Sequence, residues 1–418
     1  MITKEEFEKL VSIKLLEEDG KLVYDGNLDL EDKTDITELP ENLRVLGGLN
    51  LRNSGITKLP KGLEIEGLLE ISETDIEELP EDTMFGGSLY ADKMKKPFSF
   101  PKVVNINGHF DCEGTTIKRM PEEVYVKWSY SFSRSTFDRY PKVMEFGYGL
   151  YLNETDITEM PKGLKEVYGS FDISHTRITK LNDNFVVYNR LILSYTLIEV
   201  LLEGLIVGDE LYLDNSDLMD YSNLHKVCTK FIVTKGKYNE IKDTLTKHSF
   251  EPYKKYYCDN NNLLVSFEPN YKGAYLFENE NGKYIKADNI FGKIVEQKGN
   301  VYHVKLGKSE EISYLVTDGE GRWSHGKTLD EAKDDLLYKI TDRDKSDYEG
   351  LTLDSELSFE DAITCYRVIT GACSFGTRDF VENRLGENKK EVYTIKEIIS
   401  LTEGEYGNKV FKDFFCKE

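Results

Sequence analysis

The sequence predicts an α/β solenoid with a parallel β ladder, followed by an α+β domain. Three observations lead to this prediction. An apolar pair of the form Leu-x-Leu recurs about every 20 residues through the first half of the chain. A proline recurs in the same register, at Pro40, Pro60, Pro80, Pro101, Pro121, Pro141 and Pro161. After about residue 250 this period is lost, and aromatic residues and turn dipeptides accumulate instead. A fixed period of this length is the signature of a solenoid.

Each repeat begins with a short strand that directs two apolar side chains inward and the residue between them outward. No single coil can bury its apolar pair, so neighbouring coils must stack. We therefore expect about 10–11 coils over residues 25–236. The apolar pairs are Leu28/Leu30, Leu49/Leu51, Leu69/Ile71, Leu89/Ala91, Phe110/Cys112, Tyr130/Phe132, Leu150/Leu152, Phe171/Ile173, Leu191/Leu193, Leu211/Leu213 and Phe231/Val233.

Segments such as LNLRNSGITKLPKGLEIEG (49–67) and LYLNETDITEMPKGLKEVYG (150–169) resemble leucine-rich repeats. The likeness is to the short, 20-residue bacterial subtype found in secreted effector proteins. Where that subtype carries an asparagine, this chain mostly has a hydroxyl residue, such as Ser54, Thr74 or Thr176. We therefore expect a hydroxyl ladder in place of an asparagine ladder. In those effectors the partner domain is a cysteine ubiquitin ligase, which nothing after residue 250 resembles.

Both ends of the solenoid need caps that shield the terminal coils. Residues 1–24 are expected to form an N-terminal helical cap, with a helix over 3–16 that opens on the capping box Thr3-x-x-Glu6. Residues 237–250 are expected to form a C-terminal cap helix.

The remaining residues, 251–418, read as an α+β domain in which strands come first and helices follow. An antiparallel meander is expected from runs at 274–278, 283–287, 293–297, 301–306 and 312–317. Helices are expected to begin at Thr328, Ser358, near Thr377 and at Thr394, and a last one to lie within 406–415.

Two segments of this domain carry weaker likenesses. Residues 312–340 resemble the strand, turn and helix of HicB-type antitoxins. Residues 359–384 and 393–415 look like the C-terminal domain of uncharacterised proteins from gut bacteria and their phages. The second resemblance implies a phage or its host as the setting, and no particular chemistry.

Composition excludes several classes of protein. With 54 Lys and Arg against 76 Asp and Glu, the net charge of −22 disfavours a nucleic-acid binder. No apolar run is long enough for a membrane span, and the acidic N-terminus does not resemble a signal peptide. The 6 cysteines lack paired spacing, which favours a reducing compartment. We expect a cytoplasmic protein, in the host cytoplasm if a phage encodes it, without cofactor or metal.

The best candidate for a catalytic residue is Cys373, which lies in the segment Gly371-Ala-Cys-Ser-Phe-Gly376, ahead of an expected helix. A thiol at a helix N-terminus is a better nucleophile because its pKa is lowered, and His325 or His303 could act as its base. The alternative is that Cys373 fills a tight packing turn between two helices. No protease or ligase signature surrounds it, so we expect a non-enzymatic protein.

The outward residues of the strands form the best candidate for a binding face. Its candidate residues are Tyr90, Asp111, Tyr151, Asp172, Ile192, Tyr212 and Ile232. Tyrosines among charges suit a protein-binding surface, although tyrosine also has a high strand propensity on a merely solvated face. The sequence thus predicts an intracellular protein that binds a partner with a basic surface. A phage-encoded inhibitor of a host enzyme would be one such protein. A cysteine-dependent enzyme targeted by its repeats, and a virion or adhesion component, are the alternatives.

Overall fold

The computed structural model describes residues 2–248, 254–257, 261–288, 290–340, 344–372, 374–386 and 389–416. The chain forms two compact units. The first unit comprises Met1–Leu224, Lys230–His248 and Lys255–Ser266, and the second takes the rest of the chain.

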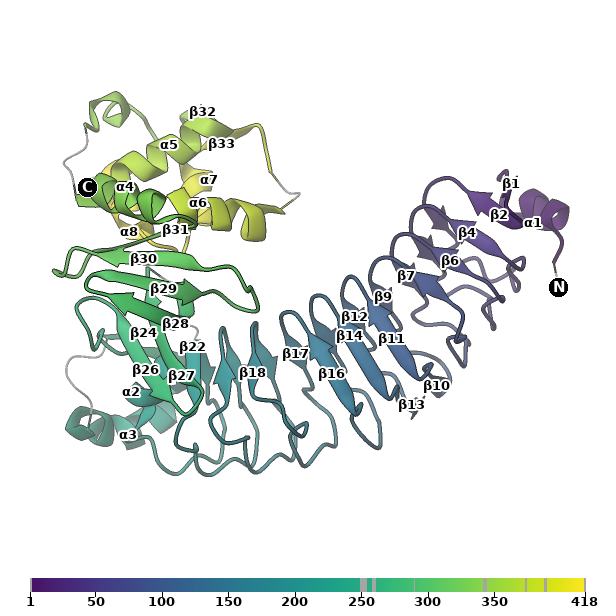
Figure 1. The fold of residues 1–418 in the computed structure, drawn as a ribbon, viewed down its shortest axis with the longest axis horizontal. Coiled ribbons are helices and arrows are strands. Elements are labelled where there is room, and N and C mark those ends of the chain that lie inside the picture. The colour runs from purple at the N-terminus through teal and green to yellow at the C-terminus, as the bar shows by residue number, and fades with distance from the viewer. Residues whose placement is uncertain are drawn as a thin grey trace. The chain divides into compact units, whose positions relative to one another are not determined.

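The first unit is a solenoid whose coils each add one short strand to a single ladder (Figure 1). Every printed pairing from β3 to β22 is parallel and joins equivalent residues of successive coils, such as Leu49 with Leu69. The predicted parallel ladder is therefore confirmed. Its strands are β3 (Leu28–Asp29), β5 (Leu49–Asn50), β7 (Leu69–Glu70), β9 (Leu89–Tyr90), β12 (Phe110–Asp111), β15 (Tyr130–Ser131), β17 (Leu150–Tyr151), β19 (Phe171–Asp172), β21 (Leu191–Ile192), β22 (Ile206–Tyr212) and β23 (Cys228–Thr234).

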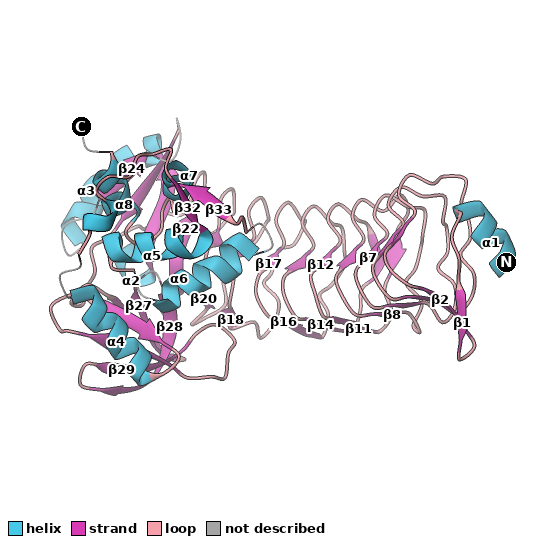
Figure 2. Ribbon diagram, turned by 90° about the horizontal axis from the view of Figure 1, so that it is seen from above, coloured by secondary structure: helices cyan, strands magenta, loops and turns pink. Residues whose placement is uncertain are grey.

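Further strands stack on other sides of the coils, again in parallel. No helix occurs between Val11 and Leu224, a stretch that the structure describes throughout, and strands and loops alone form these coils (Figure 2). The additional strands are β2 (Lys21–Tyr24), β4 (Leu43–Val45), β6 (Glu64–Ile65), β8 (Met84–Phe85), β10 (Phe98–Ser99), β11 (Val103–Ile106), β13 (Ile117–Arg119), β14 (Glu123–Val126), β16 (Val143–Phe146), β18 (Glu166–Val167) and β20 (Val186–Val187).

The apolar pairs form the core of the solenoid. No member of the eleven predicted pairs keeps more than 2% of its surface exposed. In the middle coils the core becomes aromatic: the ring of Tyr130 lies 4.8 Å from that of Phe110 and 4.3 Å from that of Phe132. Apolar residues at a spacing of two thus supply a continuous buried column along the coils, as the sequence predicts.

A turn follows each strand, and it carries a hydroxyl residue in most coils, with Lys33 and Met94 as the exceptions among the first ten. The hydroxyls of Thr74, Thr155, Thr176 and Thr196 are buried and donate to the carbonyl three residues earlier, at 2.6–2.7 Å. These hydroxyls satisfy backbone acceptors inside the coil, and the column of hydroxyl residues is interrupted at Met94. The residue before this position has a left-handed backbone, with φ between 48° and 66°, in ten successive coils. These residues are Asp32, Asn53, Glu73, Lys93, Gly114, Arg134, Glu154, His175, Tyr195 and Asn215.

The N-terminal cap is only partly helical. Helix α1 (Lys4–Val11) opens on the predicted capping box of Thr3 and Glu6. The predicted extension to residue 16 is wrong, because Ser12 adopts a left-handed backbone with φ 59° and ends the helix. The chain then forms a hairpin of β1 (Leu16–Glu18) and β2, and β2 starts one of the parallel ladders.

The C-terminal end of the solenoid has a helix and an unexpected strand. After α2 (Leu224–Val227), helix α3 (Lys235–His248) corresponds to the predicted cap helix. Strand β24 (Lys254–Tyr257) lies at the end of the sheet, and β25 (Asn262–Ser266) pairs antiparallel with β23. The sequence assigned residues 262–266 to the second domain, whereas they extend the solenoid sheet because Leu263 and Val265 are buried there.

The second unit contains an antiparallel meander of six strands in sequential order. The sequence predicts an antiparallel meander from the first five strands, and β31 is the sixth. Its core includes Tyr302 and Trp323. The strands are β26 (Tyr275–Asn279), β27 (Gly282–Ala287), β28 (Ile290–Lys298), β29 (Val301–Lys305), β30 (Ser313–Thr317) and β31 (Trp323–Gly326).

Helices follow the meander. Thr328, Ser358 and Thr394 cap helices where the sequence predicts them, each accepting a hydrogen bond from the backbone N–H three residues on. The elements are α4 (Leu329–Ile340), η1 (Ser346–Tyr348), β32 (Glu356–Ser358), α5 (Phe359–Thr370), α6 (Ser374–Phe380), η2 (Val381–Leu385), β33 (Val392–Thr394), α7 (Ile395–Leu401) and α8 (Asn408–Phe415).

Candidate binding face

Two rows of outward side chains line the strand ladder of the solenoid. The first row, the central residue of each strand motif, is Asp29, Asn50, Glu70, Tyr90, Asp111, Ser131, Tyr151, Asp172, Ile192, Tyr212 and Ile232. All but Ile232 are at least partly exposed. Ile232 keeps only 7% of its surface exposed, and its strand β23 is flanked by β22 and β25. Ile232 therefore helps to cover the sheet and does not belong to the exposed part of the predicted face.

Several polar side chains of this first row also stabilise the backbone. The carboxylate of Glu70 accepts the N–H of Ser72 at 2.7 Å, and that of Asp172 accepts the N–H of Ser174 at 2.8 Å. Asp29, Asn50 and Asp111 make the same contact two residues on, at 3.1 Å. An acidic or amide residue at this position thus ends the strand by satisfying a backbone donor, whatever else the face does.

The second row follows two residues later and comprises Glu31, Arg52, Ser72, Asp92, Glu113, Ser133, Asn153, Ser174, Ser194 and Asp214. Its serines are buried between coils. The hydroxyl of Ser133 donates to Asn153, and that of Ser194 donates to Asp214, each at 2.6 Å. These bonds link one coil to the next and hold the second row in place.

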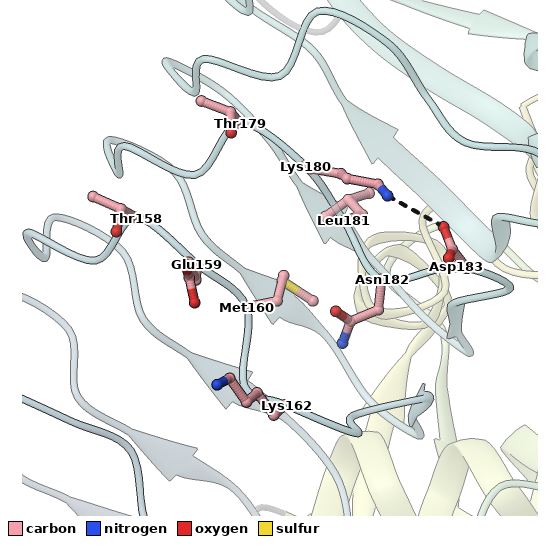
Figure 3. A pocket seen from close by; sticks show the side chains of 9 residues that line it. All are labelled: Thr158, Glu159, Met160, Lys162, Thr179, Lys180, Leu181, Asn182 and Asp183. Carbon is pink, nitrogen blue, oxygen red and sulfur yellow. Dashed lines mark ion pairs between the residues drawn. The ribbon is translucent and has the colours of Figure 1, made fainter.

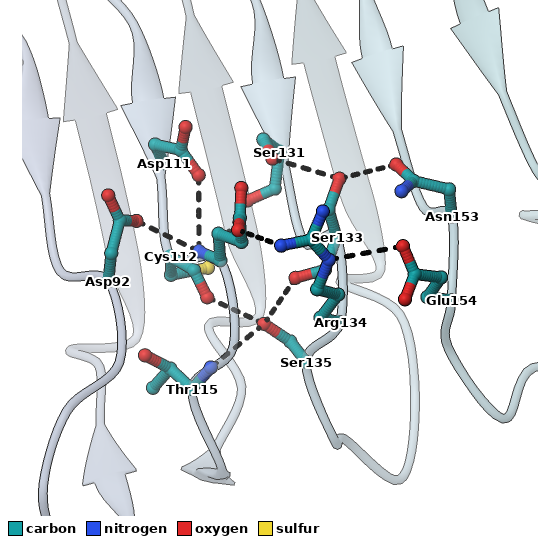
Figure 4. Close-up of polar contacts among 11 residues, drawn as sticks. Asp92, Asp111, Cys112, Thr115, Ser131, Ser133, Arg134, Ser135, Asn153 and Glu154 are labelled. Atoms are coloured by element: carbon teal, nitrogen blue, oxygen red, sulfur yellow. Dashed lines mark hydrogen bonds and ion pairs between the residues drawn. The ribbon is translucent and has the colours of Figure 1, made fainter.

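Asp92 and Asp111 lie on neighbouring coils at the middle of the face (Figure 4). Both carboxylates accept the single backbone N–H of Glu113, at 2.9 Å from Asp92 and 3.1 Å from Asp111. Burial, followed by the negative charge of Asp111, raises the pKa of Asp92 to about 7. The two carboxylates therefore repel each other while they share one donor.

The face is strongly acidic. The two rows together hold eight carboxylates and one guanidinium, that of Arg52, which pairs with Glu73. Near the middle of the ladder, Arg134 bridges Glu113 at 2.8 Å and Glu154 at 3.1 Å. Arg134 does not pair with Asp92, Asp111 or Asp172. These three carboxylates accept hydrogen bonds from backbone N–H groups and, for Asp172, from the hydroxyl of Ser174. A cationic partner would find complementary charge here.

The tyrosines of the first row are held in fixed positions. Tyr151 lies over Gly149, whose absent Cβ would come within 3.0 Å of the ring, and burial raises the pKa of Tyr151. The hydroxyl of Tyr212 donates to Glu210 at 3.0 Å. Ordered aromatic side chains lose little entropy on binding, so these residues can act as anchors.

Sequence reasoning missed two aromatic residues beside this face, Trp128 and Tyr148. They keep 47% and 42% of their surfaces exposed and lie two residues ahead of β15 and β17. The same position is a glycine in the five preceding coils, at Gly26, Gly47, Gly67, Gly87 and Gly108. A break in this glycine column is the sequence signal that could have identified them.

A shallow pocket of about 280 Å³ lies on the loops that follow β17 and β19 (Figure 3). Its lining is mostly polar, and Lys180 and Asp183 form an exposed ion pair of 3.6 Å at its rim. None of the candidate residues lines it. Its lining residues are Thr158, Glu159, Met160, Lys162, Thr179, Lys180, Leu181, Asn182 and Asp183.

The catalytic candidates do not form a site among the described residues. Cys373 lies outside them. His325 is in β31 with 1% of its surface exposed, and burial, followed by the charge of Lys339, lowers its pKa to about 3. His303 contacts Glu296 at 3.1 Å. The first N–H of α6, from Ser374, donates to the carboxylate of Asp335 at 2.7 Å. A buried, uncharged His325 cannot exchange a proton with a substrate, and the start of α6 is already capped by an anion.

The described residues contain no group of three or more His, Cys, Asp or Glu side chains arranged to hold a metal ion. No described helix has both the length and the apolar character that crossing a bilayer requires. No protein-family model, no curated protein and no solved structure matches the chain.

Proposed function

We propose that this chain is a protein-interaction module that binds another protein through the outward rows of its strand ladder. The observation that carries the proposal is the combination of ordered tyrosines with eight carboxylates and one guanidinium on one repeated surface. Aromatic anchors supply contact area, and the acidic groups favour a partner with a basic surface. A phage-encoded inhibitor of a host enzyme is one form such a protein could take.

A cytoplasmic setting is part of the proposal. The described cysteines Cys112, Cys365 and Cys416 are free thiols, and two of them are buried. Free thiols are typical of proteins in a reducing compartment, whereas small secreted domains tend to use paired cysteines. This observation supports the proposed setting independently of the strand face.

The proposal is tested by capturing partners from the native host, identifying them by mass spectrometry and measuring their affinity for variants of the full chain. Tyr151→Ala and Tyr212→Ala should each weaken partner binding by about 1–3 kcal/mol, because each removes a central aromatic anchor. Added salt should mainly slow association, because the acidic rows steer a basic partner.

Tyr125→Ala provides a matched control. Tyr125 lies in β14, on a different ladder, and its hydroxyl donates to Glu123 at 3.0 Å, as that of Tyr212 donates to Glu210. This variant should leave the affinity unchanged. If the folded double variant of Tyr151 and Tyr212 binds as tightly as the native chain, the strand face is not the interface.

A further inference from the structure

The position two residues ahead of each strand forms a column in which neighbouring coils approach closely. A Cβ on Gly67 would come within 2.8 Å of the Gly47 backbone, and one on Gly87 within 2.7 Å of Gly67. Contacts this short mean that a side chain at Gly67 or Gly87 would push the neighbouring coil away. Gly169 also occupies the column, where a Cβ would meet the backbone of Tyr148 at 2.8 Å, and Asn189 and Asp209 follow it in the next two coils.

Trp128 and Tyr148 interrupt this column in two successive coils. The backbone ladder continues past them, because Trp128 donates to Gly108 at 3.2 Å and Tyr148 donates to Trp128 at 3.0 Å. Since the space between coils is filled by backbone, the two rings extend outward, which explains their exposed fractions of 47% and 42%. Two large aromatic side chains on adjacent coils thus create an exposed platform, defined here as Trp128 and Tyr148.

Neighbouring residues hold the platform in place. The ring of His109 stacks on that of Trp128, with centroids 6.3 Å apart and planes inclined by 21°. Tyr148 lies against Gly169, whose Cβ would come within 2.6 Å of the ring, and Asn189 donates to the Tyr148 hydroxyl at 3.3 Å. A platform ordered in this way loses little conformational entropy when a partner covers it.

The charges beside the platform determine which kind of partner segment can bind to it. Asp111 is on the coil before Trp128, and Asp172 is on the coil after Tyr148, both in the first outward row. A residue rise of about 3.3 Å along a strand places this row roughly 10 Å from the platform, within the reach of one extended segment. Lysine and arginine side chains are attracted both by an aromatic face and by carboxylates. Acidic segments would be repelled by the same groups.

We propose that Trp128 and Tyr148 form the docking platform for a lysine- or arginine-bearing segment of the protein partner. This inference rests on the proposed function and assigns it a specific anchor site outside the two outward rows. The cationic side chain stacks on the aromatic rings, while further basic residues of the same segment contact the carboxylates of the first row.

The experiment uses the full chain and a short labelled peptide of alternating arginine and glycine, with a glutamine-for-arginine peptide for comparison. The chain has 2 tryptophans, and Trp323 is buried, so quenching by acrylamide reports mainly on Trp128. The arginine peptide should shield Trp128 from acrylamide. Trp128→Leu, which keeps apolar volume but removes the aromatic face, should weaken the peptide affinity between about twofold and thirtyfold.

Tyr195→Ala is the control for a general loss of surface aromatic area. Tyr195 is 49% exposed, stacks on His175 and lies in the turn that follows the strand. It should leave the peptide affinity unchanged. The platform assignment is overturned if the native chain binds the glutamine peptide as tightly as the arginine peptide. It is also overturned if the folded double variant Trp128→Leu/Tyr148→Leu keeps the native affinity for the arginine peptide.

The captured partner separates this inference from the proposed function. If Tyr151→Ala weakens partner binding while Trp128→Leu and Tyr148→Leu do not, the strand face stands and the platform fails. If the platform variants weaken binding and the strand-face variants do not, the proposed rows are wrong and the platform stands. Weakened binding in both sets supports both.

Discussion

Phe132→Ala is expected to lower the free energy of unfolding of the solenoid by about 3–5 kcal/mol, because it leaves a cavity in the middle of the stack. Phe132 is fully buried, and its ring lies 4.3 Å from that of Tyr130 and 5.9 Å from that of Phe110. The preceding coil contributes Phe110 to this aromatic cluster, so the stack cannot close the cavity without shifting the ladder. Urea unfolding followed by far-ultraviolet circular dichroism measures the change.

Two variants make this prediction specific. Asp29→Ala removes an exposed side chain whose hydrogen bond is to the Glu31 N–H at 3.1 Å, so it should cost at most about 1 kcal/mol. Tyr130→Phe keeps the buried ring and removes a hydroxyl that has no hydrogen-bond partner among the described residues, so stability should be unchanged or higher. Equal urea midpoints for Phe132→Ala and Asp29→Ala would contradict the inward and outward assignment of the strand residues.

Asp335→Ala is expected to lower the stability of the second unit by about 2–4 kcal/mol, because it leaves buried donors without an acceptor. Asp335 is buried in α4 and accepts Arg367 from α5 at 2.8 Å and the Ser374 N–H from α6 at 2.7 Å. The hydroxyl of Ser374 also donates to it. One carboxylate thus joins three helices. Because the side chain of Arg367 remains partly exposed, the loss of stability should be smaller than for a fully buried ion pair.

The neighbouring Asp334 supplies the control. It lies in the same helix and is exposed, so Asp334→Ala should change stability by less than about 0.5 kcal/mol. Chemical unfolding followed by the fluorescence of Trp323, which is buried in the meander core, reports on this unit. If both variants unfold at the same urea concentration, Asp335 does not join the helices in the way the structure indicates.

Local patterns predicted most of the fold. The register of apolar pairs predicted the ladder from Leu28 to Tyr212, and capping residues such as Thr3 and Thr394 predicted where helices begin. Both signals depend on residues within one turn or one coil of each other. The pairing of β25 with β23 was not predictable in this way, because it joins segments about 30 residues apart that share no repeat.

The candidate site was less predictable. Alternation placed Tyr151 and Asp111 outward, but it could not show that Ile232 is covered by flanking strands. The burial of His325 depends on the packing of α4 against β31, whose Gly326 would meet Ala332 within 2.5 Å if it carried a Cβ. Trp128 and Tyr148 precede the strands, where only comparison between coils reveals that glycine is the rule.

The burial of Asp92 beside the carboxylate of Asp111 couples the folding of the solenoid to the uptake of a proton. Asp92 has an ordinary pKa of 3.8 when exposed, and its pKa is raised to about 7 in the folded chain. Between these two values the folded chain holds a proton that the unfolded chain has released, so the free energy of unfolding falls as the pH rises through this window. The centre of the face thus holds a pair of carboxylates whose repulsion opposes folding as the pH rises through this window. Either a proton on Asp92 or a cation bound beside it would relieve the repulsion between the carboxylates of Asp92 and Asp111.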